Sequence, residues 1–189
     1  KTRNQIYFSK KKYKEIYLIK RGSKLGVGSA HKCGLKWGYL KKYKTILTIE
    51  ELEVWIKKIE EKGIVAVDTE TNSLNPHEAI LVGISLCYSP GVACYIPLEN
   101  ENEKLLEKKL VLKKLKIILE DKSIKKIGQN IKFDYIIFLH NGIKLNSIED
   151  TMLMSYVLDA GKNRHNMDIL SEIHLNHKTI SFKEVAGSG

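Results

Sequence analysis

The sequence of 189 residues has few cysteines, no long apolar run and no closely paired histidines. Its three cysteines, Cys33, Cys87 and Cys94, lack the spacing of a metal site, and their odd number predicts reduced, buried thiols in a cytoplasmic protein. No run approaches the roughly 18 apolar residues of a membrane span, so we expect a soluble protein without a membrane partner. The six histidines show neither HxH nor HExxH spacing, which argues against a histidine-ligated metal ion.

Arginine is also scarce, with 3 residues against 29 lysines, although the formal net charge is +10. A cationic surface attracts a polyanion and releases its counterions, so this charge is compatible with a nucleic-acid partner. The excess of lysine comes with many isoleucines and asparagines, a bias that A/T-rich codons would produce whatever the function. The charge therefore permits nucleic-acid binding without establishing it, and the lysine clusters are first of all solvated faces.

The length and the hydrophobic content of 43% suit one domain with one core. Residues 1–44 show no clean period and form a basic N-terminal extension, so we place the domain at 45–189. A capping box opens the domain, because the hydroxyl of Thr48 can accept from the third helical amide while Glu51 reaches back to the cap amide. Apolar residues follow at helical spacing, and Gly63 ends this predicted helix.

Short apolar runs separated by turn signals follow this helix. The pattern predicts strands at 64–67, 79–86, 93–96 and 125–127, and helices at about 101–119, 131–141 and 151–158. The first three strands should form a meander. Because helix and strand alternate after them, we expect an α/β domain whose mixed sheet is flanked by helices.

Three acidic residues stand beside these predicted strands. Asp68 and Glu70, two positions apart, end the strand that begins at Ile64, so both carboxylates should point to one side. Asp134 opens the helix after the fourth strand, which could carry it towards the first two acids. Three converging oxygen donors would suit Mg²⁺ or Mn²⁺. Acids also occupy such positions simply because they are solvated, so the pattern alone leaves both interpretations open.

A series of sequence blocks accompanies these acids in order along the chain. The blocks are Asp68-Thr69-Glu70-Thr71-Asn72-Ser73-Leu74, Pro90-Gly91-Val92-Ala93-Cys94-Tyr95-Ile96-Pro97, Gly128-Gln129-Asn130-Ile131-Lys132-Phe133-Asp134, Asp150-Thr151-Met152-Leu153, Arg164-His165-Asn166-Met167-Asp168 and His177-Lys178-Thr179-Ile180-Ser181-Phe182. On these blocks the sequence from Ile64 to Phe182 resembles the 3′–5′ exonuclease domain of bacterial DNA polymerase I, in the DEDD nuclease superfamily. The resemblance implies a ribonuclease H-like fold, in which a three-strand antiparallel meander and parallel strands form a mixed sheet flanked by helices. Adjacent first and fourth strands would bring Asp134 near Asp68 and Glu70.

The resemblance also implies a role for each of the three acids in a site that holds two divalent ions, Mg²⁺ or Mn²⁺. Asp68 would bridge both ions, and Glu70 would help to hold the ion on the nucleophile side. Asp134 would hold the ion of the leaving group, largely through water. All three acids are therefore expected to be metal-binding and catalytic residues.

Contacts with the substrate follow from the same resemblance. They are implied for Thr71, Leu74, Gln129, Asn130, Phe133, Arg164 and Phe182. Leu74 would wedge against the terminal base, and Phe182 would stack on a nucleotide whatever its base. The alternative roles are packing in the core for these two side chains, capping of a helix for Asn130 and plain solvation for Arg164.

The chain departs from the family where a third motif would supply a fourth carboxylate and, four residues before it, a tyrosine. No Tyr-x-x-x-Asp follows Phe182 before the sequence stops at Gly189, so we expect a C-terminally truncated domain. The missing acid belongs to the ion on the nucleophile side, so water activation should suffer more than strand binding. Asp150 and Asp168 are not expected to replace it, because a helix cap and a first-turn acid are their predicted roles.

The function that these expectations describe is removal of nucleotides from a single-stranded DNA 3′ end, weak or absent in the chain as given. The family implies a polymerase domain after this one in the intact protein, in the cytoplasm of a bacterium and near its nucleoid. Two alternatives stay open. One is a domain that binds single strands or spaces other domains without catalysis, and the other is a DEDD ribonuclease that acts on RNA 3′ ends.

Overall fold

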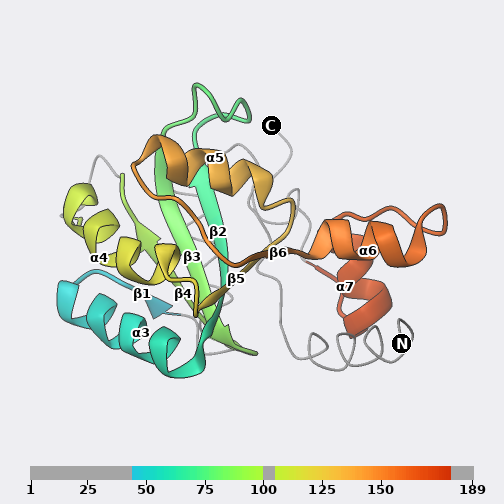
Figure 1. Ribbon diagram of the computed structural model, residues 1–189, viewed down its shortest axis with the longest axis horizontal. Helices are drawn as coiled ribbons and strands as arrows, with labels where there is room; N and C mark the ends of the chain where they lie inside the picture. The colour runs from blue at the N-terminus through green and yellow to red at the C-terminus, as the bar shows by residue number, and fades with distance from the viewer. Residues whose placement is uncertain (1–43, 100–104, 180–189) are drawn as a thin grey trace.

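The computed structural model describes residues 44–99 and 105–179, and within them six strands form one mixed sheet with the order β1-β4-β3-β2-β5-β6 (Figure 1). The strands are β1 (Lys44–Thr45), β2 (Ile64–Thr71), β3 (Leu81–Ser89), β4 (Val92–Pro97), β5 (Lys125–Gly128) and β6 (Ile148–Asp150). The helices of this described part are α3 (Ile49–Lys62), α4 (Lys108–Glu120), α5 (Lys132–His140), α6 (Thr151–Asp159) and α7 (Met167–Leu175). The predicted fold class is confirmed. Most of the proposed N-terminal extension, and Phe182, lie outside the described residues.

The middle of the sheet is the predicted meander, since β2 pairs antiparallel with β3 and β3 pairs antiparallel with β4. The strands β5 and β6 continue the sheet in parallel on the other side of β2. The prediction that Asp68 and Glu70 end their strand is wrong, because β2 continues to Thr71. The apolar run stops at Val67, but β3 pairs with β2 as far as Thr71 and keeps the chain extended through both acids.

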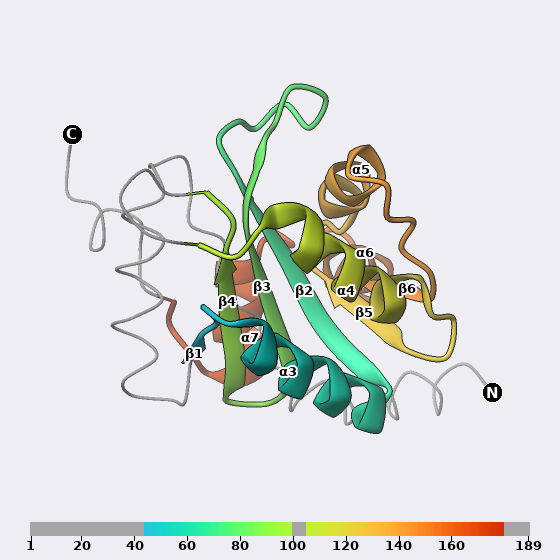
Figure 2. The ribbon, with the colours of Figure 1, turned by 90° about the vertical axis from the view of Figure 1, so that its left-hand side faces the viewer.

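Two helices, α3 and α4, cover one face of the sheet, and α6 and α7 lie on the other side (Figures 1 and 2). The capping box of α3 is present, because the amide of Glu51 donates to the hydroxyl of Thr48 at 3.3 Å. The carboxylate of Glu51 accepts from the amide of Leu47, one residue before the predicted partner. Gly63 ends the helix as predicted, with a left-handed φ of 63°. The helix predicted from about residue 101 begins instead at Lys108.

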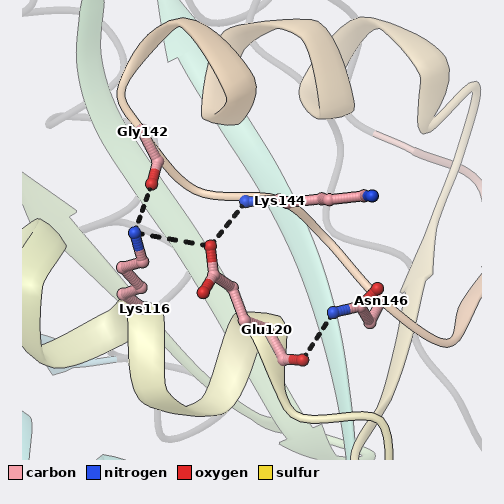
Figure 3. Close-up of polar contacts among 5 residues, drawn as sticks. All are labelled: Lys116, Glu120, Gly142, Lys144 and Asn146. Carbon is pink, nitrogen blue, oxygen red and sulfur yellow. Dashed lines mark hydrogen bonds and ion pairs between the residues drawn. The ribbon is translucent and has the colours of Figure 1, made fainter.

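The C-terminal end of α4 is bound by two other parts of the chain. Lys126, in β5, is fully buried and its ammonium donates to the carbonyls of Ile118, Asp121 and Ile124. Figure 3 shows the second attachment, in which the side-chain amide of Asn146 donates to the carbonyl of Glu120 at 2.6 Å. Three further contacts in the same view join Lys116, Glu120, Gly142 and Lys144. These bonds fix the segment that leads from α5 into β6.

The two cysteines in the described part of the chain behave as small apolar residues. Cys87 and Cys94 are both buried in the sheet, as predicted, and neither forms a disulfide. Burial raises the pKa of the Cys87 thiol to about 11 and raises that of Cys94 well above its ordinary value. Cys33 lies outside the described residues. Within the described residues, no helix is long and apolar enough to cross a membrane.

Candidate active site

The two acids of β2 lie on one face of the middle of the sheet. Asp68 is directly opposite Ser85 of β3 and Glu70 is directly opposite Gly83, so all four residues point to the same side. This is the face that carries the small cluster of Ala66, Cys87, Ala93 and Ile127, opposite the side covered by α3 and α4. The register of β2 and β3 shifts immediately after Glu70, a kind of irregularity that often re-aims side chains beside an active site.

Asp134, in the first turn of α5, is bound to Thr69, the residue between these two acids in the sequence. Its Oδ1 accepts from the amide of Thr69 at 2.9 Å and from the hydroxyl of the same residue at 2.5 Å. Both bonds are buried, and the Asp134 side chain is 1% exposed. Asp134 is therefore held against the strand that carries Asp68 and Glu70, and the convergence of all three carboxylates on one cation stays a prediction.

The short length of β5 explains why Asp134 is needed there. Parallel pairing of β2 with β5 covers only Ile64 to Ala66, so the backbone of Thr69 lies beyond that ladder. A buried amide without a partner is costly, and the carboxylate of Asp134 accepts its hydrogen in place of a strand. Helix α5 is thus attached to β2 at the point where the acids project.

The donor set fits a hard divalent cation by its chemistry, because all its atoms are carboxylate oxygens. The geometry does not complete a ligand set. Across residues 44–99 and 105–179, no three histidine, cysteine, aspartate or glutamate side chains are close enough to hold one metal ion. Since Oδ1 of Asp134 is engaged by Thr69, the arrangement fits direct coordination by Asp68 and Glu70 better than direct coordination by all three.

Asp150 has a larger role than the helix cap that the sequence predicts. Its Oδ1 does cap α6, by accepting from the amides of Met152 at 2.8 Å and Leu153 at 3.4 Å. The same carboxylate accepts from the amides of Asn130 and Ile131, both at 3.0 Å. One side chain therefore binds the start of α6 and the turn that leads into α5. That turn needs support, because Asn130 has a left-handed φ of 58°.

Gln129 links the same turn to the segment that carries Arg164. Its Nε2 donates to the carbonyl of His165 at 2.8 Å, and its Oε1 accepts from the hydroxyl of Thr151 at 2.5 Å. Arg164 itself is exposed. Asn130 does not cap α5, since the N-cap position of α5 is Ile131 and no described side chain caps this helix. The alternative role of Asn130 is therefore excluded, and that of Arg164 is compatible with its exposure.

The remaining predicted substrate residues fall into different surroundings. Leu74 is 58% exposed, so it does not pack in the core. Phe133 is buried in the main core, where its ring packs among apolar side chains. The hydroxyl of Thr71 donates to the carbonyl of Ser73 at 2.8 Å and so holds the turn that presents Leu74.

One tyrosine near the acids and one contact of α7 carry no signal in the local sequence pattern. Tyr95 of β4 lies on the same face as Asp68 and Glu70, because it pairs with Ser85. Burial and the nearby carboxylate of Glu70 raise the pKa of Tyr95 above its ordinary value. Asp168 lies in the first turn of α7 as predicted, and it also accepts from the hydroxyl of Thr179 at 2.5 Å.

The arrangement of the sheet and helices defines a nuclease-type fold. RNase D from Trypanosoma brucei matches it with a TM-score of 0.60 at 14% identity, over 74% of this chain and 49% of that chain. NrnC from Brucella melitensis, solved with bound Mg²⁺, matches it with a TM-score of 0.55 at 24% identity, over 74% of this chain and 63% of that chain.

The sequence identifies the family within that fold. A family profile described as 3′–5′ exonuclease matches residues 43–189. DNA polymerase I from Rhizobium leguminosarum is 41% identical over 167 residues, which cover 78% of this chain and 16% of that protein. The chain belongs to this 3′–5′ exonuclease family, as a domain homologous to that of bacterial DNA polymerase I. It spans only a small part of the length of that relative.

Proposed function

We propose that this domain hydrolyses nucleotides from the 3′ end of single-stranded DNA with the help of divalent cations. The observation that carries the proposal is the pair of hydrogen bonds from Thr69 to Asp134, which attaches a helix-borne acid to the residue between Asp68 and Glu70. Phosphodiesters are anionic and repel hydroxide, so a nuclease must neutralise the phosphate and stabilise the leaving oxygen. Clustered acids serve this purpose when cations bind between them and the substrate.

The three acids hold Mg²⁺ or Mn²⁺ in different ways. When bound, such ions neutralise the phosphate, activate water and stabilise the leaving 3′ oxygen. Asp68 and Glu70, on one face of a rigid strand, supply direct oxygen ligands. Asp134, whose Oδ1 remains on Thr69, acts largely through water. The bound Mg²⁺ of the Brucella melitensis NrnC structure supports this choice of cation.

The DNA strand is held by the residues around the acids. Leu74, exposed on the loop after β2, wedges against the terminal base, and the exposed Arg164 contacts a phosphate. Thr71, Gln129 and Asn130 act closer to the acids, and Gln129 is held in place by its two bonds to His165 and Thr151. Phe133 supports them from the core, and Phe182 is proposed to stack on a nucleotide.

A second candidate is a domain that binds single strands without cleaving them. It is favoured by the incomplete ligand set among the described residues. Retention of Asp68, Glu70 and Asp134 favours catalysis, since a spacer gains nothing from three neighbouring acids. A ribonuclease is less favoured, because the relative that is 41% identical is a DNA polymerase I.

The partners in the cell follow from the same relatives. We propose that a polymerase domain follows this one in the intact protein, and that the 3′ end of a DNA strand passes between them. Such a protein works in the bacterial cytoplasm at the nucleoid.

The proposal is tested by Mn²⁺-dependent release of nucleotides from a labelled single-stranded DNA 3′ end, with this chain and its Asp68→Ala variant. We expect weak release by the wild-type chain and none by the variant, because Asp68 is a proposed ligand of the cation. Mn²⁺ binding, measured by electron paramagnetic resonance, should fall in the variant as well. Asp168→Ala is the matched control, since its acid lies on α7 and should leave both readouts unchanged.

Equal release and equal Mn²⁺ binding by wild type and Asp68→Ala would remove the catalytic proposal. Strand binding without any Mn²⁺-dependent release would support the second candidate. That binding should weaken between low and physiological salt, because released counterions drive it.

A further inference from the structure

Tyr95 is a half-buried polar residue to which no role has been given. It lies in β4 opposite Ser85, which in turn lies opposite Asp68, so its side chain shares the face of the acids. Its hydroxyl is buried and has no hydrogen-bond partner among the described residues. Buried tyrosine hydroxyls normally form a hydrogen bond, so a hydroxyl without one needs an explanation.

The ring of Tyr95 lies over Gly83. A Cβ atom added at Gly83 would lie 2.1 Å from the hydroxyl oxygen of Tyr95 and 2.5 Å from its ring. The ring therefore leans along the face of the sheet, over the one residue whose missing side chain leaves room for it. The hydroxyl stands where a side chain at position 83 would begin.

This position is the cross-strand neighbour of Glu70, because Gly83 and Glu70 are directly opposite each other in β3 and β2. The Cβ atoms of such a pair are typically about 5 Å apart. The carboxylate of Glu70 extends two atoms beyond its Cβ, so it can reach the hydroxyl of Tyr95. A phenol is a hydrogen-bond donor at neutral pH, and a carboxylate is an acceptor.

We propose that Tyr95 is a positioning residue for Glu70: its hydroxyl, which makes no hydrogen bond within the described part of this structure, donates one to a carboxylate oxygen of Glu70 when a cation is bound and leaves the other oxygen directed at the cation. The inference rests on the proposed function, since it assigns to Glu70 the role of a metal ligand. Partners that orient a ligating carboxylate typically contribute about tenfold or more to metal affinity. Gly83 is part of the same arrangement, because any side chain at this position would displace the ring of Tyr95.

The test compares Tyr95→Phe with the wild-type 189-residue chain. We expect Mn²⁺ affinity, measured by electron paramagnetic resonance, to fall about tenfold. The urea midpoint should stay equal or rise, because the variant removes only a buried hydroxyl. Tyr88→Phe is the matched control: Tyr88 packs on Trp55 of α3, with ring centroids 4.8 Å apart, and should leave Mn²⁺ affinity unchanged.

Two further variants separate the possible failures. If Asp68→Ala binds Mn²⁺ as well as the wild type, the proposed function fails, and the inference fails with it. If Asp68→Ala loses Mn²⁺ while Tyr95→Phe keeps it, only the inference is overturned. Gly83→Ala should also weaken Mn²⁺ binding by displacing the ring; a loss in Gly83→Ala without a loss in Tyr95→Phe would show that the hydroxyl is not the positioning group.

Discussion

Replacing Asp150 with alanine should lower the free energy of unfolding by about 3 kcal/mol, well above the loss of an ordinary helix cap. The carboxylate accepts from four backbone amides, two at the start of α6 and two in the turn before α5. The two amides of α6 are partly exposed and can turn to water, so losing the cap costs about 1 kcal/mol. The amide of Ile131 is buried, and a buried amide without a partner costs about 2 kcal/mol.

Urea denaturation followed by circular dichroism measures this difference. The matched control is Asn166→Ala, because Asn166 caps α7 through one exposed bond to the amide of Ile169. That variant should lose only about 1 kcal/mol. The loss of unfolding free energy for Asp150→Asn should lie between these two values. Its single acceptor oxygen can still cap α6, but its amide group faces the amide of Ile131. A loss for Asp150→Ala equal to that for Asn166→Ala would refute the reasoning, because it would show that the turn gains nothing from the carboxylate.

Two further changes test other buried groups. Burial lowers the pKa of Lys126 to about 8, so between about pH 8 and pH 10.5 the unfolded chain holds a proton that the folded chain has released. The unfolding free energy of the wild type, relative to that of Lys126→Met, should therefore rise across this window by up to about 1.4 kcal/mol per pH unit and should stay constant below pH 7. Urea denaturation at a series of pH values measures this difference. A difference that falls as the pH rises would contradict the assignment. Thr69→Val should cost about 1.5 kcal/mol in urea denaturation, because it removes the hydroxyl bond to Asp134 and keeps the amide bond. Thr69→Ser is its control, and equal stability of the two variants would show that the hydroxyl contributes nothing.

Local patterns in the sequence predicted the parts of the fold that depend on neighbouring residues. The cap at Thr48 and the end of α3 at Gly63 depend on side chains and backbone freedom within one helical turn, and both are present. The three strands of the meander were also found, with shifted ends. The end of β2 was wrong because pairing with β3, and not the apolar run, decides how far the strand extends.

Contacts between segments that are far apart in the sequence could not be predicted from those local patterns. The approach of Asp134 to β2 was expected from the resemblance to the exonuclease family, and the structure shows the contact that holds it there, with the amide and hydroxyl of Thr69. The second use of Asp150, on an amide 20 residues away, could not be read from a helix-cap signal. Nor could the path of Tyr95 over Gly83, since it depends on the register of two strands.

The attachment of α5 to β2 has a consequence for sequence change at position 69. Half of that attachment is made by a main-chain hydrogen, which every amino acid except proline provides. Mutation can therefore replace the threonine, lose its hydroxyl and still leave the helix tethered to the strand. Proline alone would cut this tether outright, so position 69 should accept other small residues that fit its buried site in related chains yet exclude that one.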